Sequence, residues 1–73
     1  MQQLDIDTVI GKRFNVVSMR RFPVLQRKEL YVRGIVPGKE MQLVQVSPLG
    51  DPLIILVDRK KFAINRMMWG LFD

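Results

Sequence analysis

Hydrophobic residues occur along this chain in short runs separated by glycine, proline or charged residues, a pattern typical of short strands joined by turns. The first run, residues 14–18, predicts a strand that ends at a basic pair. The longest run, residues 53–57, is apolar on both faces, as expected of a buried central strand. Residues 58–61 are polar and predict a hairpin connection, after which residues 62–64 predict a short returning strand.

After the first strand the sequence predicts one helix. Pro23 suits the first helical turn, because the N–H that proline lacks has no helical partner there. The helix is expected over residues 24–33, and Gly34 can adopt the left-handed conformation that ends a helix, with Ile35 then contacting Leu30. The apolar residues of this helix are Leu25, Leu30, Tyr31 and Val32. They follow the 3.6-residue period of a helix only imperfectly.

The apolar positions change phase between residues 40 and 46. Met41 and Leu43 fall on one face of a strand, whereas Val44 and Val46 fall on the other. Because no glycine or proline interrupts this strand, the change of phase indicates a bulge or a sharp bend. Small closed barrels need such bent strands.

The end of the chain predicts a helical turn followed by a short strand. Asn65 is a good N-cap for residues 66–69, Gly70 can close that turn, and residues 71–73 are expected to begin a last strand. Four or five short strands in 73 residues are too few for a two-layer sandwich. We therefore expect a single, mainly β domain over residues 1–73, a small SH3-like barrel with one short α-helix and a C-terminal helical turn.

Glycine and proline residues are assigned to turn geometry rather than to ligand contacts. Gly50 is expected to need a positive φ, and Asp51 is interpreted as a turn former, with partner recognition as the alternative. The predicted turn residues are Gly34, Pro37, Gly38, Pro48, Gly50, Asp51 and Pro52.

The composition removes most catalytic and metal chemistry. The chain has no cysteine and no histidine, which excludes disulfides, thiolate nucleophiles, Cys- or His-based zinc sites and Ser-His pairs. Scattered carboxylates and methionine thioethers remain, and they are a poor ligand set for a transition metal. We expect no catalytic residues, no cofactor and no metal site. The lack of a long apolar run or a signal peptide indicates a cytoplasmic protein without membrane insertion.

The charge of the chain is unevenly distributed. The formal net charge is +5, and residues 12–39 hold eight of the twelve Lys and Arg residues but only one acidic residue, Glu29. A basic surface favours an acidic partner. The candidate binding residues are Arg20, Arg21, Arg27 and Lys28.

Two further interpretations concern the apolar residues. An apolar contribution to binding is assigned either to Leu49 at a hairpin tip or to Met67 and Trp69, for which packing over the open side of the barrel is the favoured alternative. The basic half could instead bind nucleic acid, with stacking groups from Phe14, Phe22 and Tyr31.

Three motifs together resemble the ferrous iron transport protein A (FeoA) family. They are the Gly-apolar-x-Pro-Gly turn within residues 33–38, the Pro-x-Gly-Asp-Pro hairpin within residues 47–55, and the apolar-Ala-apolar strand at residues 62–64. Their order and spacing match the family along roughly residues 9–72. Arg33 and Asn65 depart from the residues that the family usually has at these positions.

The resemblance implies an SH3-like barrel and an accessory, regulatory role in bacterial ferrous iron uptake. The implied partner is the membrane transporter, ferrous iron transport protein B (FeoB), through its cytosolic G-protein region. Nucleic acid is then not an expected partner, and recruitment to the inner face of the inner membrane follows from the location of the transporter. Weak self-association stays open.

Overall fold

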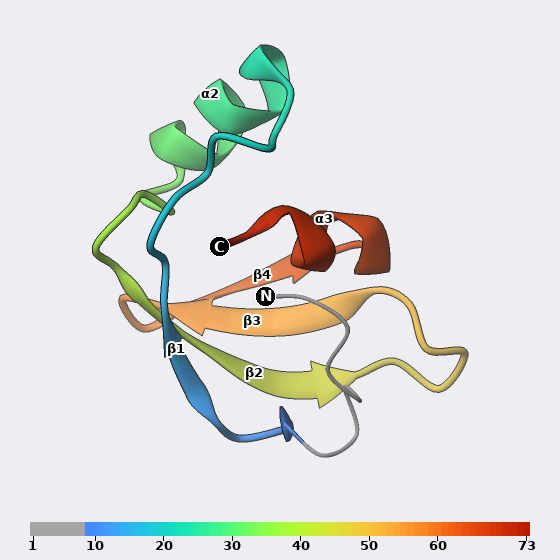
Figure 1. Cartoon of the computed structure of the whole chain (residues 1–73). Coiled ribbons are helices and arrows are strands. Elements are labelled where there is room, and N and C mark those ends of the chain that lie inside the picture. The colour runs from blue at the N-terminus through green and yellow to red at the C-terminus, as the bar shows by residue number, and fades with distance from the viewer. Residues whose placement is uncertain (1–8) are drawn as a thin grey trace.

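The computed structural model describes residues 9–73. Within this part the chain forms a four-stranded antiparallel sheet in the order β1-β2-β3-β4, with α3 close to the sheet and α2 farther out (Figure 1). This mainly β arrangement confirms the predicted SH3-like barrel. The elements are β1 (Arg13–Asn15), α2 (Val24–Val32), β2 (Glu40–Val46), β3 (Leu53–Val57), β4 (Lys60–Ile64) and α3 (Arg66–Leu71).

Strand β2 contains the predicted bulge. Leu43 pairs with Ile55, but the next pair is Gln45 with Ile54, so Val44 is an extra residue opposite β3. The bulge accounts for the change of phase in the hydrophobic pattern of this strand. It also bends the strand, as a small barrel requires.

The turn between β3 and β4 is shorter than predicted. The sequence predicted a connection over residues 58–61, whereas β4 already begins at Lys60 and pairs with Val57. Asp58 and Arg59 form the two-residue turn with φ values of 50° and 68°. Positive φ at both central residues is the geometry that matches the twist of an antiparallel hairpin. Asp58 and Arg59 adopt it although neither of them is a glycine.

The C-terminal residue pairs with the segment that follows β1. The first strand ends at Asn15 rather than at residue 18, and Val16 still accepts a hydrogen bond from the Gly38 amide at 2.7 Å. The backbone then changes partner, because the Val17 amide donates to the Asp73 carbonyl (2.9 Å) and the Asp73 amide donates to the Ser18 carbonyl (3.1 Å). The prediction of a last strand over residues 71–73 is thus wrong, because Leu71 belongs to α3 and only the backbone of Asp73 pairs with another segment.

The predicted ends of the helices are partly confirmed. The amide of Ile35 donates to the Leu30 carbonyl at 3.0 Å and Gly34 has a φ of 86°, which is the expected C-terminal motif of α2. The Asn65 side chain caps α3 by accepting from the Met68 amide at 2.8 Å. Gly70, however, lies inside α3, which continues to Leu71.

The core fills the space between the sheet and α3. Two aromatic pairs meet edge to face, Phe22 with Phe72 at 4.9 Å and Phe14 with Trp69 at 5.5 Å between ring centroids. The buried core residues are Val9, Val16, Met19, Phe22, Leu30, Ile35, Met41, Leu43, Leu53, Ile55, Val57, Ile64, Trp69 and Phe72.

Candidate protein-interaction surface

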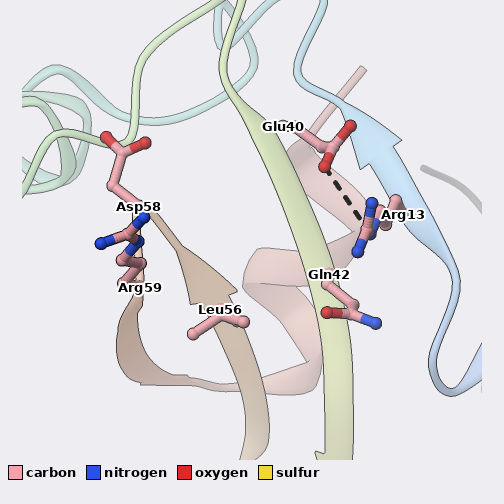
Figure 2. Close-up of a pocket in the computed structure, with 6 residues that line it drawn as sticks. All are labelled: Arg13, Glu40, Gln42, Leu56, Asp58 and Arg59. Atoms are coloured by element: carbon pink, nitrogen blue, oxygen red, sulfur yellow. Dashed lines mark ion pairs between the residues drawn. The ribbon is translucent and has the colours of Figure 1, made fainter.

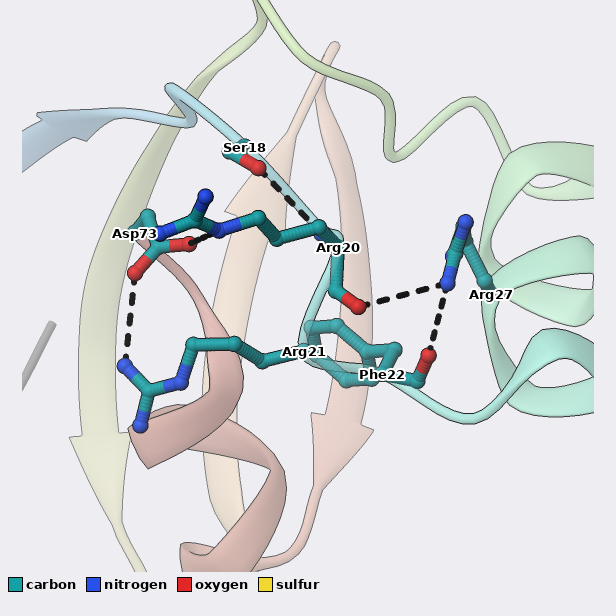
Figure 3. Close-up of polar contacts among 6 residues, drawn as sticks. All are labelled: Ser18, Arg20, Arg21, Phe22, Arg27 and Asp73. Carbon is teal, nitrogen blue, oxygen red and sulfur yellow. Dashed lines mark hydrogen bonds and ion pairs between the residues drawn. The ribbon is translucent and has the colours of Figure 1, made fainter.

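Arg27 holds α2 against the loop that precedes it. Its guanidinium Nη2 donates to the carbonyl of Phe22 at 3.0 Å and to the carbonyl of Arg20 at 3.3 Å (Figure 3). The residue is half-buried, and its Nη2 serves loop carbonyls rather than a partner. Of the four basic candidates, Arg27 therefore has a structural role in this fold.

Arg20 and Arg21 share one carboxylate. Asp73 lies between them, with Oδ1 at 3.3 Å from Nη1 of Arg21 and Oδ2 at 4.0 Å from Nε of Arg20 (Figure 3). The Ser18 hydroxyl also accepts from the Arg20 amide at 3.2 Å. Exposed ion pairs such as these add little stability. Two cations against one carboxylate leave a net positive charge on the surface at this point.

Lys28 is exposed on α2, and it forms no ion pair or hydrogen bond in the part of the chain that the structure describes. The structure thus brings Arg20, Arg21 and Arg27 together around the loop, and it leaves Lys28 separately exposed on α2.

Helix α2 turns most of its apolar residues outward. Leu30 reaches the core with 2% exposure, whereas Leu25 is 76% and Val32 is 88% exposed. The sequence predicted these residues as one imperfect apolar stripe and did not separate the buried residue from the exposed ones. A rotation of about 100° per residue places Leu30 roughly opposite Leu25 and Val32, and that signal could have found the division. The exposed set, called here the α2 apolar face, consists of Val24, Leu25, Tyr31 and Val32.

The other apolar candidates separate into exposed and buried residues. Leu49 is 97% exposed in the turn between β2 and β3, and Met67 is 83% exposed on α3. Trp69 is buried, so its side chain is not accessible to a partner and the packing alternative holds for it. The Asp51 carboxylate accepts from the Arg66 amide at 3.0 Å, which ties this turn to the start of α3.

Two of the three aromatic residues considered for base stacking pack inside the domain. Phe22 is buried against Phe72, and Phe14 is half-buried against Trp69. Tyr31 alone of the three belongs to an exposed surface. The proposed stacking platform for nucleic acid is therefore not assembled.

A shallow pocket of about 250 Å³ lies on the outer side of the sheet (Figure 2). On one side of it the Arg13 guanidinium is 3.7 Å from the Glu40 carboxylate, so these two charges are paired with each other. Small-molecule sites are usually larger, roughly 300–1,000 Å³. None of the sequence candidates lines it; the lining residues are Arg13, Glu40, Gln42, Leu56, Asp58 and Arg59.

Within residues 9–73 no three acidic side chains gather in a way that could hold a metal ion. Nor does any helix of the described residues have the length and apolarity needed to cross a membrane.

Solved structures with a similar fold carry related names. The solution structure of iron(II) transport protein A from Clostridium thermocellum is 29% identical, with a TM-score of 0.77, over 89% of this chain and 40% of that one. The solution structure of the FeoA protein from Chlorobium tepidum is 25% identical, with a TM-score of 0.77, over 86% and 59%. A crystal structure of an iron uptake regulatory protein (FeoA) is 27% identical, with a TM-score of 0.71, over 86% and 80%.

The match spans 40% of the length of the first structure and 59% of the length of the second, less than two thirds of either. None of the curated proteins compared with this chain matches it. The sequence model of the FeoA domain matches residues 6–69, which is most of the chain. Together with the SH3-like fold, this match shows that the chain belongs to the FeoA domain family.

Proposed function

We propose that this chain is an accessory protein of bacterial ferrous iron uptake that regulates the membrane transporter FeoB by binding its cytosolic G-protein region. The observation that carries the proposal is the family match over residues 6–69. The names of similar structures, an iron(II) transport protein A and an iron uptake regulatory protein, support the same process. The domain would act at the cytoplasmic face of the inner membrane.

Binding rather than catalysis suits the chemistry of the chain. Without cysteine or histidine, a catalytic site would need carboxylates, lysines or hydroxyls gathered in a cleft. The described pocket is small, and its Arg13 and Glu40 are paired with each other. The exposed cations and the α2 apolar face are instead features by which proteins recognise proteins.

The test is binding of the purified chain to the cytosolic region of FeoB from the same genome. Association rates would be measured without nucleotide, with GDP and with a non-hydrolysable GTP analogue, at low and high salt. The variant Arg20→Glu/Lys28→Glu reverses two exposed cations, and Lys60→Glu/Lys61→Glu is a control with the same charge change on β4.

We expect the first variant to associate severalfold more slowly than the control at low salt, because a complementary field raises the association rate. The difference should shrink at high salt as the charges are screened. Equal rates for both variants would remove Arg20 and Lys28 from the mechanism. Absence of binding by the unmodified chain in every nucleotide state would contradict the proposed function.

A further inference from the structure

Helix α2 presents an apolar face that nothing in the described part of the chain covers. Val24, Leu25 and Val32 are exposed aliphatic residues, and Leu30 is the buried residue of the helix. Leu25 and Val32 are seven positions apart, and Val24 and Val32 are eight apart. Residues at these spacings lie on one side of a helix, so these side chains form one contiguous strip rather than scattered exposures. Contiguous exposed apolar surface marks an interaction site more often than isolated residues do.

The charges around the strip constrain what can cover it. Lys28 lies between Val24 and Val32 at four-residue spacing, so its ammonium group belongs to the same side of the helix. On α2 and at its C-cap there are three cations, Arg27, Lys28 and Arg33, and a single acidic residue, Glu29. A covering surface must therefore offer apolar side chains together with carboxylates.

This requirement separates the candidate occupants. A second copy of the chain would bring its own Lys28 and neighbouring arginines, and like charges would oppose the contact. A lipid surface attracts cations, but helices that bind it usually carry tryptophan or phenylalanine on the apolar face. Here that face has three branched aliphatic residues and Tyr31 around a central cation, with no tryptophan or phenylalanine, which suits ridges-into-grooves packing against another helix.

We propose that the α2 apolar face is a docking surface for an acidic amphipathic helix of a protein partner. The inference rests on the proposed function in that it takes this helix to belong to the cytosolic region of FeoB. Nine helical residues span about 13 Å, so the contact covers two to three turns of the partner. A contact of this size is typical of weak, transient regulatory complexes.

The experiment compares two double variants that remove equally exposed apolar side chains. Leu25→Gln/Val32→Gln changes the α2 apolar face, and Leu49→Gln/Met67→Gln is the matched control at the other exposed sites. All four side chains are at least three-quarters exposed, so both variants should keep the melting temperature of the unmodified chain. We expect the first to bind the FeoB cytosolic region at least tenfold more weakly and the control to bind normally.

A second arm uses a synthetic helical peptide with a leucine stripe flanked by glutamates, and the same peptide with lysines as its control. We expect the acidic peptide to shift the NMR amide signals of residues 24–33, and the lysine peptide to shift none of them. Vesicles containing phosphatidylglycerol, and the sedimentation of the chain alone, test the lipid surface and the second copy.

The outcomes separate the inference from the proposed function. If the unmodified chain does not bind FeoB, the proposed function is wrong, and the peptide arm alone decides the inference. If FeoB binds the α2 variant and the unmodified chain equally, or if the Leu49/Met67 control loses binding instead, the function stands and the inference is overturned. Vesicle binding or self-association that the α2 variant abolishes, without peptide binding, also overturns it.

Discussion

Replacing Gly50 with valine should destabilise the domain through backbone strain alone. Gly50 lies in the turn between β2 and β3 with a φ of 86°, and its amide donates to the Ser47 carbonyl at 2.7 Å. A valine there would have room, because the nearest atom to an added Cβ is the end of the flexible Arg66 side chain at 4.0 Å. The cost therefore arises from the left-handed conformation, which a β-branched residue strongly disfavours.

The expected loss is about 1–3 kcal/mol of unfolding free energy. A domain of this length typically has a total of about 4–11 kcal/mol, so the change is a large fraction of it. Each kcal/mol corresponds to a fall of roughly 4–8 °C in melting temperature for a small domain. Calorimetry or thermal circular dichroism of Gly50→Val would measure the fall.

Gly70→Ala provides the matched control. Gly70 lies within α3, has no positive φ and leaves open space around an added Cβ, so alanine should leave stability unchanged or raise it by up to about 1 kcal/mol. Opposite signs for the two substitutions are the expected result. An unchanged melting temperature for Gly50→Val would refute the argument from strain.

Three further outcomes are expected. Trp69→Ala should cost about 3–5 kcal/mol by leaving a cavity next to Phe14, whereas Met67→Ala on the exposed side of α3 should stay within about 0.5 kcal/mol, both measured by urea unfolding. Arg27→Met should cost about 1–3 kcal/mol by removing the donors to two loop carbonyls, and an equal effect of Lys28→Met would contradict that role. Anaerobic calorimetry should detect no tight, stoichiometric Fe²⁺ site; micromolar affinity that one carboxylate substitution abolishes would show that this prediction is wrong.

The features predicted from sequence are those that depend on a few neighbouring residues. The left-handed conformations of Gly34 and Gly50, the Asn65 cap and the bulge near Val44 were predictable because backbone geometry there follows from local residue type and periodicity. The hairpin connection after β3 was predicted, but its two-residue turn at Asp58 and Arg59 was not, because this turn lacks the glycine that usually marks a positive φ.

The contacts and the exposure of the candidate surface residues could not be predicted, because they depend on tertiary packing. Sequence identified the cations Arg20, Arg21 and Arg27 but not what they contact, because Asp73 and the loop carbonyls become neighbours only in the folded chain. The outward direction of Val32 likewise depends on which side of α2 rests on the barrel. Local patterns predict that a helix forms, whereas the side that it buries, here that of Leu30, depends on packing against the rest of the core.

The contacts of Asp73 have a consequence for how the domain folds. Arg21 and Asp73 are 52 positions apart in the sequence, and the backbone bonds to Val17 and Ser18 join equally distant parts of the chain. Bringing such positions together loses chain entropy before any interaction forms, which slows folding relative to a protein with local contacts. We expect the strands β2, β3 and β4 to pair first and this contact to form late, so that substitutions at Asp73 accelerate unfolding more than they slow folding.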